Sequence, residues 1–545
     1  MMKTLFPFLL FLLSMGNVFA DGDPYREDRV RWMQKAEAAK PALHKEVVLP
    51  AALVRAVRDS TAFQGWRYER IGDPGDLSRQ GFKSVPEVTL DFGRHLVGYL
   101  SFHTKTAKGC LDSPLRLKFT FGERPIDLNM PYDPWDKGRL GRGWIQDEIM
   151  VLDHLDDWVT IPRRMAFRYV KIEMDGWPGG GYDVSIDRLF FTAQSSAGPL
   201  KAALPDTCPL LERAIYEVGI ETLRECMQTV YEDGPKRDQR LWIGDMYLQA
   251  LANRHSFRDP ALTLRGLYLF AALAWEDGTL PASIIETPKP HPQPNYIPQY
   301  AQLWNVTLLD YLKETGDRET AEDLWKVAKE QIRAGLRFVG EDGVYDASLG
   351  QAWHFIDHRA GLDVNAPAQG ILLFALRRTW ELARLLGKED EVPEYPALIR
   401  RLEKGGRKAW YNARRGLVES GPSRQVSLIA QAWMVISGIL TPREGAAAIR
   451  KAWETEGCIM PGSPYATHYL MEAMLQSGMR EEAKTYLEEY WGGIVEKGFD
   501  TFPEAYDPKD ALYSPYHFVP LNSNCHAWSC TPVYFIQAYP EIFQR

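Results

Sequence analysis

The sequence predicts a mainly α protein in which an (α/α)6 barrel follows an antiparallel β-sandwich domain. Residues 46–200 contain short runs rich in β-branched and aromatic residues, separated by Gly, Pro and Asp. Such runs are typical of antiparallel strands. From Asp206 onward the chain instead shows about twelve segments with helical periodicity. A chain of 545 residues is also long enough for two domains.

The first twenty residues predict a secretory signal peptide, residues 1–20. Lys3 precedes an apolar run, residues 5–13, and Ala20 ends a small-residue cleavage site. The apolar run is too short to cross a bilayer. The residue directly after Ala20 is Asp21 and not a cysteine, so we expect no lipid anchor, and no later stretch predicts a membrane span. The protein is therefore expected to be secreted or periplasmic.

The composition narrows the class of partner. Hydrophobic residues make up 45% and charged residues 25%, as in globular proteins. The net charge of −8 argues against a nucleic-acid partner, because phosphate binding needs a basic surface. The six cysteines show no CxxC pair, which argues against a zinc site and leaves their pairing open. We expect neither a metal nor a cofactor.

Two segments precede the predicted barrel. Residues 21–45 predict a helical arm, and residues 46–200 predict the β-sandwich. The runs that predict its strands are PEVTLDFGRHLVGYLSFHTK, LRLKFTFGE, DEIMVLD, YVKIEMDGW and YDVSIDRLFFTAQ.

Residues 206–545 predict the barrel, with six inner and six outer helices in alternation. Asp206 and Thr207 before Pro209 predict the first helix start, because a capping side chain is followed by proline in the first turn. The loops that join inner to outer helices gather at one end of such a barrel, where a site is expected. The predicted helices start near residues 208, 240, 260, 297, 318, 365, 391, 424, 442, 465, 480 and 524.

The stretch YEDGPKRDQRLWIGD concentrates charge in the first of these connections. It carries four acidic and three basic residues between Tyr231 and Asp245. Asp233, Asp238 and Asp245 are candidate functional carboxylates, because crowded like charges can keep one acid protonated near neutral pH. A solvated turn with surface ion pairs is the other interpretation of the same pattern.

Two more clusters are candidates for function. In GFDTFPEAYDPKDALYSPYHFVPLNSNCHAWSC, Glu504 lies among aromatic residues and proline, and His526 is expected to open the last helix beside Trp528. In AWHFIDHRAG, the histidines could bind a metal or could be ordinary loop residues, and no further ligand set is visible. That motif contains Trp353, His354, Asp357, His358 and Arg359.

The Tyr231–Asp245 stretch resembles the signature of glycoside hydrolase family 78, the bacterial α-L-rhamnosidases. In that family a motif of the form Asp-Cys-Pro-x-Arg-(Asp)-Glu-Arg, ending in Gly-Asp, opens the active site of an (α/α)6 barrel. LDFGRHLVGYL and AFRYVKIEM are similar to recurrent phrases of the family's sandwich, and LNSNCHAWSCTPVYFI is similar to its last inner helix. The resemblance covers the chain from about residue 85 onward. The residues that match the signature in order are Asp233, Pro235, Arg237, Gly244 and Asp245.

The sequence departs from the family pattern in three places, so the resemblance implies a divergent, short member. The family's general acid is a Glu, but Asp238 stands at its place in the shorter form of the motif. In the longer form that place is Gln239, and an amide cannot donate a titrating proton. The base is preceded by Pro503 rather than Trp, and the family's usual C-terminal β domain does not follow the last predicted helix.

The resemblance implies a site for a terminal sugar. Asp238 would be the acid and Glu504 the base of an inverting reaction, in which the acid protonates the leaving oxygen and the base activates water on the opposite face. Asp357 would also bind substrate. The residues implied to hold hydroxyl groups are Asp233, Arg237, Asp245 and His526, and those implied to form an apolar wall are Trp242, Trp304, Trp353 and Trp528. Trp304 could equally be a core residue.

The implied function is a secreted, exo-acting glycoside hydrolase that removes terminal α-L-rhamnose, or a related 6-deoxy sugar, from oligosaccharides or glycans. Two alternatives stay open. One is an enzyme on the same barrel that resembles the unsaturated uronyl hydrolases and hydrates a double bond. The other is a non-catalytic carbohydrate-binding protein, which the presence of Gln239 and Pro503 would allow.

Overall fold

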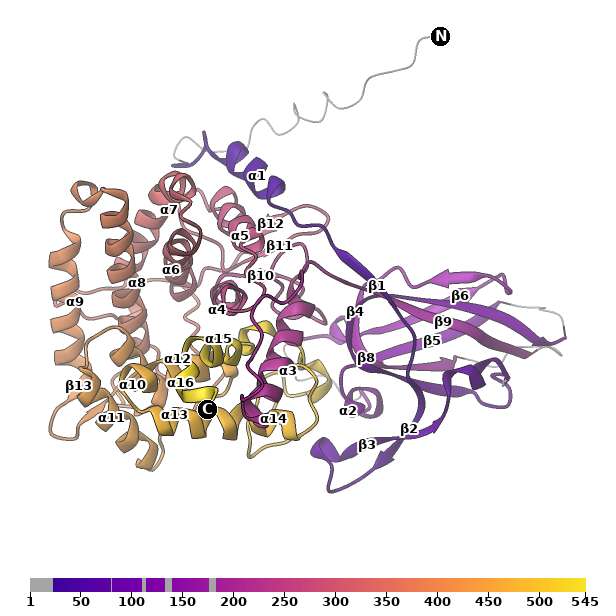
Figure 1. Cartoon of the computed structure of the whole chain (residues 1–545). Helices are drawn as coiled ribbons and strands as arrows, with labels where there is room; N and C mark the ends of the chain where they lie inside the picture. Colours follow the sequence, from indigo (N-terminus) through magenta and orange to yellow (C-terminus); the bar gives the residue numbers. More distant parts are fainter. Residues whose placement is uncertain (1–22, 80, 110–113, 133–139, 176–182) are drawn as a thin grey trace, which may run out of the picture.

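An antiparallel sheet domain is followed by a helical domain (Figure 1), which confirms the predicted order of the two parts. The predicted signal peptide, residues 1–20, and Cys110 lie outside the described residues. No helix in the described part of the chain is both long and apolar enough to cross a membrane. The computed structural model describes residues 23–79, 81–109, 114–132, 140–175 and 183–545.

The N-terminal arm belongs structurally to the helical domain. Its helix α1 (Arg29–Ala38) packs against α5 (Ala261–Ala272). Trp32 is completely buried there and is part of the helical domain's hydrophobic core. Strand β1 (His44–Val48) then pairs with the last strand of the sheet, β9 (Asp183–Ser195). The chain therefore crosses from one domain to the other within a few residues.

The sheet domain contains one connected antiparallel sheet rather than two separate ones. Its main path has the order β1-β9-β4-β8-β5-β6, and β2, β3 and β7 attach beside it. The reason is the length of β4, which pairs with β8 through its first half and with β9 through its second. The remaining strands are β2 (Ala52–Arg58), β3 (Trp66–Gly72), β4 (Glu87–Lys108), β5 (Leu115–Gly122), β6 (Asp147–Leu152), β7 (Trp158–Thr160) and β8 (Met165–Met174).

Alternating apolar side chains build the core of this sheet. Leu100 and Phe102 of β4 are buried together with Leu117 and Phe119 of β5 in a hydrophobic cluster of the sheet domain. A side chain cannot be placed at Gly98, because its Cβ would lie 1.9 Å from the carbonyl oxygen of Thr192 on β9. The close approach of β4 and β9 therefore depends on glycine at this position.

The helices of the second domain form a closed ring of neighbours. Along the ring α4 packs on α6, α6 on α8, α8 on α10 and α10 on α12. A short 3-10 turn, η8 (Ala527–Ser529), closes it by contacting both α12 and α4. The helices of the ring are α4 (Ile243–Arg254), α6 (Pro298–Thr315), α8 (Asn365–Leu386), α10 (Leu428–Ile436) and α12 (Pro464–Gln476), with α15 (Pro532–Ala538) after η8.

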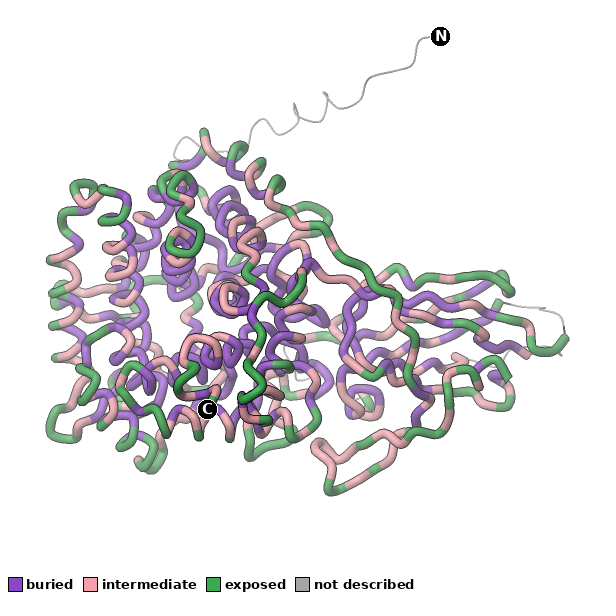
Figure 2. Tube along the Cα trace, viewed as in Figure 1, coloured by how far each residue is buried: buried purple, intermediate pink, exposed green. Residues whose placement is uncertain are grey.

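A second set of helices alternates with these along the chain and covers them. Figure 2 shows the difference: most of the α6 and α12 traces is buried, whereas α9 and α11 have exposed faces. The covering helices are α3 (Leu210–Cys226), α5, α7 (Arg318–Leu336), α9 (Tyr395–Trp410), α11 (Pro442–Glu454) and α13 (Arg480–Leu487), which continues through η6 (Glu488–Gly492) and α14 (Gly493–Glu496).

Two details of the predicted helix starts are wrong: the capping of the first helix of the barrel and the start of the last helix. Helix α3 begins at Leu210, after Pro209, and Pro209 makes no side-chain capping bond. Asp206 and Thr207 therefore lie outside the helix. His526 does not open the last helix either: it precedes the turn η8, and α15 begins at Pro532. Proline fits at the first helical position because its N–H would have no partner there.

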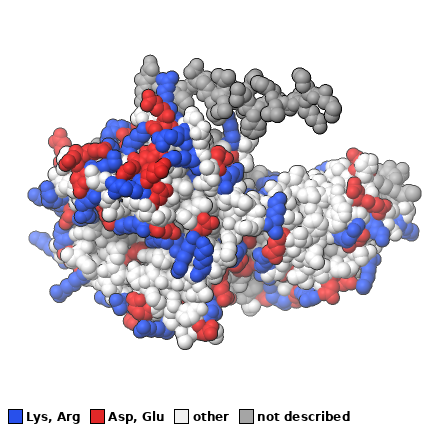
Figure 3. Space-filling view, turned by 45° about the horizontal axis from the view of Figure 1, so that its top comes forward, with Lys and Arg blue, Asp and Glu red and all other residues white. Residues whose placement is uncertain are grey.

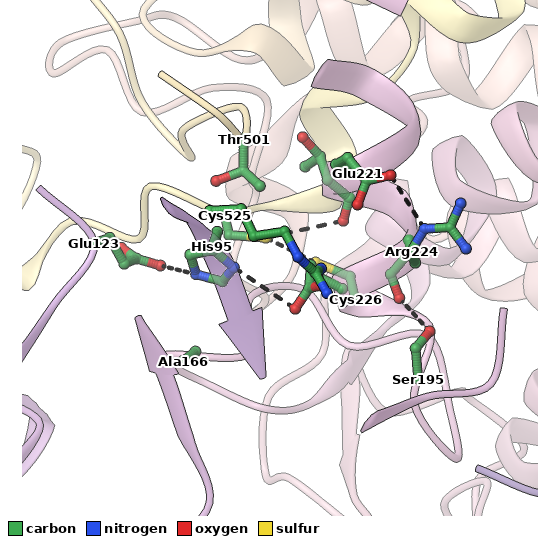
Figure 4. Close-up of polar contacts among 12 residues, drawn as sticks. His95, Glu123, Ala166, Ser195, Glu221, Arg224, Cys226, Thr501 and Cys525 are labelled. Carbon is green, nitrogen blue, oxygen red and sulfur yellow. Dashed lines mark hydrogen bonds and ion pairs between the residues drawn. The ribbon is translucent and has the colours of Figure 1, made fainter. Parts of the chain in front are cut away.

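Buried polar side chains join the two domains. The Nε2 atom of His95 on β4 lies 3.2 Å from Glu123, and its Nδ1 atom lies 3.7 Å from Glu225 on α3. Figure 4 shows this ring between elements of both domains, beside Cys226 and Cys525. The Sγ atoms of these two cysteines are 3.9 Å apart. On the surface, by contrast, basic and acidic side chains intermingle over the face drawn in Figure 3.

We predict that the arm stabilises the helical domain. Trp32→Ala leaves a cavity against α5 and should lower the free energy of unfolding by about 3–5 kcal/mol. Val30→Ala on the same helix is the control, because Val30 is 59% exposed, and it should change stability by less than about 0.5 kcal/mol. Urea unfolding followed by circular dichroism measures both. Equal, small effects of the two changes would contradict the assignment of the arm to the core.

Candidate active site

One cavity of about 740 Å³ collects the predicted site residues at the end of the helical ring. It is lined by the loop before α4, the start of α6, the loop before α8 and the segment between α14 and α15. Three of the sequence clusters therefore meet in space. The predicted residues that line it are Asp233, Arg237, Asp238, Trp242, Asp245, Trp353, Asp357, Glu504, His526 and Trp528.

The loop between α3 and α4 is held in shape by Asp233. Its two carboxylate oxygens accept the backbone N–H groups of Asp238, at 3.2 Å, and Arg240, at 3.1 Å. Gly234 allows the tight turn, because a Cβ there would lie 2.6 Å from the carbonyl oxygen of Arg237. The side chain of Asp238 lines the cavity between the guanidinium groups of Arg237 and Arg240, each 3.4 Å away.

An ion pair connects this loop to Glu504. Arg237 Nη2 lies 2.6 Å from Glu504 Oε2, and both side chains are about 95% buried. The same guanidinium donates through Nε to the carbonyl oxygen of Leu521 at 2.6 Å. It also lies 4.1 Å from the ring centroid of Tyr516. Arg237 therefore holds the first connection of the ring and the last one together.

The surroundings of Glu504 keep its carboxylate ionised. Burial alone would raise its pKa, but the charge of Arg237 and a contact with His358 lower the pKa below its ordinary range. Tyr516 donates its hydroxyl to Oε1 at 2.5 Å, and His358 Nε2 lies 3.3 Å from the same oxygen. The backbone is fixed as well, because Trp528 Nε1 donates to the Glu504 carbonyl oxygen at 2.9 Å.

His526 lies between two buried aspartates. Its Nε2 atom is 3.8 Å from Asp233 and its Nδ1 atom is 3.6 Å from Asp245 Oδ1. Burial lowers the pKa of His526 to about 3, so the ring is neutral near pH 7. Burial also raises the pKa of Asp245, and the charges of Asp233 and Glu504 add to that shift. Neither Asp245 Oδ1 nor His526 Nδ1 has a hydrogen-bond partner among the described protein atoms.

Aromatic side chains form one wall of the cavity. Trp242 meets Trp353 and Tyr300 edge to face, at centroid distances of 6.2 and 6.4 Å. Phe355 stacks on Trp528 with an interplanar angle of 14°. Tyr300 fits because residue 244 is glycine: a Cβ there would lie 2.3 Å from the Tyr300 ring. The wall offers flat apolar faces of the kind that sugar rings pack against.

Two residues of the predicted clusters are not in this cavity. Trp304 is completely buried in the core of the helical domain. It lies one turn of α6 beyond Tyr300, and Tyr300 is the aromatic residue of that helix that reaches the cavity. The prediction of Trp304 as a wall residue is therefore corrected to a core residue. His354 also points elsewhere: its Nδ1 atom lies 3.2 Å from the Gln299 amide and from the Tyr345 hydroxyl.

Asp357 lines the cavity but has a structural task too. Its oxygens accept hydrogen bonds from Gly462 N at 2.7 Å and from Ser463 Oγ at 2.6 Å. Its neighbour His358, interpreted from the sequence as a metal ligand or an ordinary loop residue, faces Glu504. Within the described residues no group of three or more His, Cys, Asp or Glu side chains is arranged to hold a metal ion.

Sequence reasoning did not single out several residues that complete the site. Tyr300, Phe355 and Tyr516 line the cavity. The only sequence signal for them was that each lies among aromatic residues near a candidate, namely Trp304, Trp353 and Glu504. Tyr516 is the most informative of these, because it touches both Glu504 and Arg237. Its position in an irregular segment gave no periodicity from which to predict that contact.

Two family models match the chain. The glycosyl hydrolase family 78 alpha-rhamnosidase N-terminal domain matches residues 50–193. The bacterial alpha-L-rhamnosidase 6 hairpin glycosidase domain matches residues 209–539. A comparison with curated proteins found no match.

Solved structures agree with these models. A rhamnosidase from Klebsiella oxytoca with rhamnose bound is 35% identical, with a TM-score of 0.90, over 94% of this chain and 99% of that chain. The fold alone is shared with the family 78 rhamnosidase of Bacillus sp. GL1, at 19% identity and TM-score 0.68, over 86% of this chain and 49% of that chain. It is also shared with Streptomyces avermitilis α-L-rhamnosidase complexed with L-rhamnose, at 15% identity and TM-score 0.65, over 92% of this chain and 44% of that chain.

The fold and the carboxylate-lined cavity, together with these matches, define a glycoside hydrolase. The chain belongs to glycoside hydrolase family 78, and it is an α-L-rhamnosidase-like enzyme. The resemblance inferred from Tyr231–Asp245 is thereby confirmed.

We predict strong energetic coupling between Arg237 and Glu504. At pH 7 Arg237→Met leaves a buried carboxylate unpaired and should cost about 3–5 kcal/mol of stability. Adding Glu504→Gln removes that charge, so the double variant should be less destabilised than the sum of the single variants. Urea unfolding of the four proteins gives the coupling, and additive effects would contradict it.

The same pair predicts the sign of a pH dependence. Because the folded-state pKa of Glu504 is lowered, its contribution to stability is fully present above the unfolded value of about 4.3. The contribution is lost as the pH falls through the lower folded value. The free energies of unfolding of wild type and Glu504→Gln should therefore differ most, and by a constant amount, above a pH of about 4.3, and they should converge in strong acid.

Proposed function

We propose that the protein is an exo-acting enzyme that removes terminal α-L-rhamnose, or a related 6-deoxy sugar, from oligosaccharides or glycans with inversion at the anomeric carbon. The observation that carries the proposal is the placement of Asp238 and Glu504 on two sides of the Arg237 guanidinium, in one cavity with an aromatic wall. The similarity to a rhamnosidase with rhamnose bound supports the choice of sugar.

Glu504 suits the role of general base. It must be ionised to accept a proton from water, and its environment lowers its pKa. The hydrogen bond from Tyr516 and the contact with His358 fix the carboxylate at Oε1, while Arg237 contacts Oε2. This rigidity favours one orientation of an attacking water.

Asp238 suits the role of general acid better than its neighbours. The Gln239 side chain donates to the carbonyl oxygen of Pro235 at 2.8 Å and does not line the large cavity. Asp233 is occupied by two backbone N–H groups. Among the acids of the loop, Asp238 is therefore the one whose carboxylate lies at the cavity without such backbone bonds.

The remaining residues would bind the sugar. Asp245 Oδ1 and His526 Nδ1 are buried polar atoms that lack partners within the described protein, which costs about 1–3 kcal/mol per group. Sugar hydroxyls would satisfy them, with Asp233, Arg237 and Asp357 nearby. The aromatic wall of Trp242, Trp353 and Trp528 would meet the ring face and the methyl group of a 6-deoxy sugar.

In the proposed reaction Glu504 takes a proton from a water molecule while the oxygen of that water attacks the anomeric carbon. The bond to the glycosidic oxygen breaks at the same time, and Asp238 gives that oxygen its proton. The products are the free sugar with inverted configuration and an alcohol, and both acids exchange protons with solvent to reset. Inverting pairs lie about 6.5–9.5 Å apart, which leaves room for the water.

The proposal includes two further elements. The helical ring would be an (α/α)6 barrel, which is supported by the twelve alternating helical segments between residues 210 and 538. The enzyme would be secreted or periplasmic, for which residues 1–20 are the only support.

We predict that the wild type hydrolyses an aryl α-L-rhamnoside and releases rhamnose from rhamnose-containing oligosaccharides. Asp238→Asn and Glu504→Gln should each lower kcat by about 10²–10⁴-fold, the usual contribution of a positioned acid or base. Asp390→Asn and Glu341→Gln are matched controls on the exposed surface and should retain full activity.

An inactive wild type with intact fold would contradict the proposal. Binding of rhamnose without turnover would then favour the carbohydrate-binding alternative. Loss of absorbance from an unsaturated uronyl oligosaccharide would favour the hydration alternative.

We also predict the stereochemistry of the product. Proton NMR of the early reaction should show the β anomer of L-rhamnose first, followed by slow mutarotation. Initial formation of the α anomer would contradict the inverting mechanism and would require a carboxylate near enough to form a covalent intermediate.

A further inference from the structure

A second, smaller cavity of about 350 Å³ adjoins the one that holds Glu504. It is lined by Gly143, Trp144 and Arg163 of the sheet domain and by residues 236–239 of the loop before α4. The two cavities share Arg237 and Asp238, whereas Glu504 lines only the larger one. The carboxylate proposed as the acid therefore stands at the boundary between the two spaces.

We propose that the smaller cavity is the leaving-group subsite and that it binds the neutral pyranose to which the terminal sugar is linked. This inference rests on the proposed function. In an inverting reaction the water approaches one face of the sugar from the base, and the leaving group departs on the side of the acid. The larger cavity holds the base, so the space across Asp238 is where the departing alcohol belongs.

The side chains of the smaller cavity suit a sugar ring. Trp144 ends the 3-10 turn η3 (Arg142–Trp144), is only partly buried and lies 5.5 Å from the guanidinium of Arg240. An indole face beside polar groups stacks on pyranose rings, and the amide of Gln239 and the guanidinium of Arg163 could meet hydroxyls. The volume falls within the range of about 300–1,000 Å³ found for ligand pockets.

The charges favour a neutral sugar over a uronic acid. Arg163 Nη1 lies 3.2 Å from Glu148. Lys236 is buried and lies 3.3 Å from Asp127 and 3.4 Å from Glu123. Arg237 pairs with Glu504. Each cation of the lining is thus already matched by a carboxylate of the protein, which leaves no uncompensated positive charge for the carboxylate of an acidic sugar.

The same contacts explain how a sheet domain can take part in the chemistry of a helical one. Lys236 is adjacent to Arg237 in the loop, and its Nζ atom also donates to the carbonyl oxygen of Asn522 at 2.9 Å. Glu123 and Asp127, which bind it, belong to the sheet domain. These buried ion pairs therefore tie the loop of Asp238 to the domain that carries Trp144.

The test compares two substrates that have the same terminal sugar and different leaving groups. α-L-Rhamnosyl fluoride loses fluoride without protonation and places nothing in a leaving-group subsite. A neutral rhamnosyl disaccharide, with rhamnose linked to a hexose, must use both the acid and the subsite. For Trp144→Ala, the ratio of kcat/KM on the disaccharide to kcat/KM on the fluoride should fall at least about fivefold, the scale of a lost aromatic contact.

Two further variants sharpen the result. Trp144→Tyr keeps an aromatic face and should recover most of the ratio. Trp158→Ala removes another tryptophan of the sheet domain, one that is 42% exposed and lines neither cavity, and it should leave the ratio within twofold of wild type. Circular dichroism and thermal midpoints confirm that each variant is folded.

Different failures have different meanings. If wild type is active but Trp144→Ala keeps the ratio within twofold, the subsite assignment is wrong and the proposed function stands. The same ratio is also measured with a disaccharide in which rhamnose is linked to a uronic acid. If Trp144→Ala lowers the ratio only for that substrate, the assignment of a neutral sugar to the subsite is wrong. If wild type hydrolyses neither substrate, the proposed function fails and the subsite with it.

Discussion

The ion pair between Arg237 and Glu504 is the contact on which the site depends. The two residues are 267 positions apart in the chain, and the pair joins the first connection of the helical ring to the last. Bringing both charges out of water is costly, and the attraction compensates only where geometry is good and the other polar atoms are satisfied. Here Leu521 and Tyr516 provide those additional contacts. The pair thus joins the first and last connections of the ring and keeps the proposed base ionised.

The sheet domain contributes a second, independent fastening of the same loop. Glu123 lies 3.4 Å from Lys236, and it accepts the backbone N–H of Asn524 at 2.6 Å. One buried carboxylate therefore contacts the loop that carries Asp238 and the segment that carries His526. Among the described residues of the sheet domain only Leu140 lines the large cavity. The domain nevertheless fastens two of the segments that do line it.

The sequence was sufficient for the order of the domains and for most helix starts. Starts expected near 391 and 424 lie at Tyr395 and Leu428, and that at 318 lies at Arg318, because amphipathic periodicity and capping residues report local structure. The predicted start of the last helix was wrong, because the conformation of residues 501–531 is determined by tertiary contacts. One of these is the hydrogen bond that Ala527 N donates to the Asp233 carbonyl oxygen. No local pattern encodes such a contact.

The candidate site, too, could be predicted from the sequence only in part. The resemblance to a family transfers by position, and it placed Asp238 and Glu504 among the candidate residues. Both line the large cavity, and their catalytic roles stay a prediction. Trp304 and Tyr300 lie one turn apart on α6, and the sequence alone could not tell which of them reaches the cavity. That choice depends on Gly244, a residue of another helix whose missing side chain makes room for Tyr300.

The crowding of charge in Tyr231–Asp245 follows from the different tasks of its carboxylates. On a helix, residues 233, 238 and 245 would point in different directions, whereas an irregular loop lets all three converge. Asp233 is bound to backbone N–H groups and shapes the loop, and Asp245 stands in the first turn of α4 opposite His526. Asp238 alone borders both cavities among these three. The interleaved Arg237 and Arg240 reduce the repulsion among these carboxylates, because both guanidinium groups lie beside Asp238 and Arg237 also pairs with Glu504.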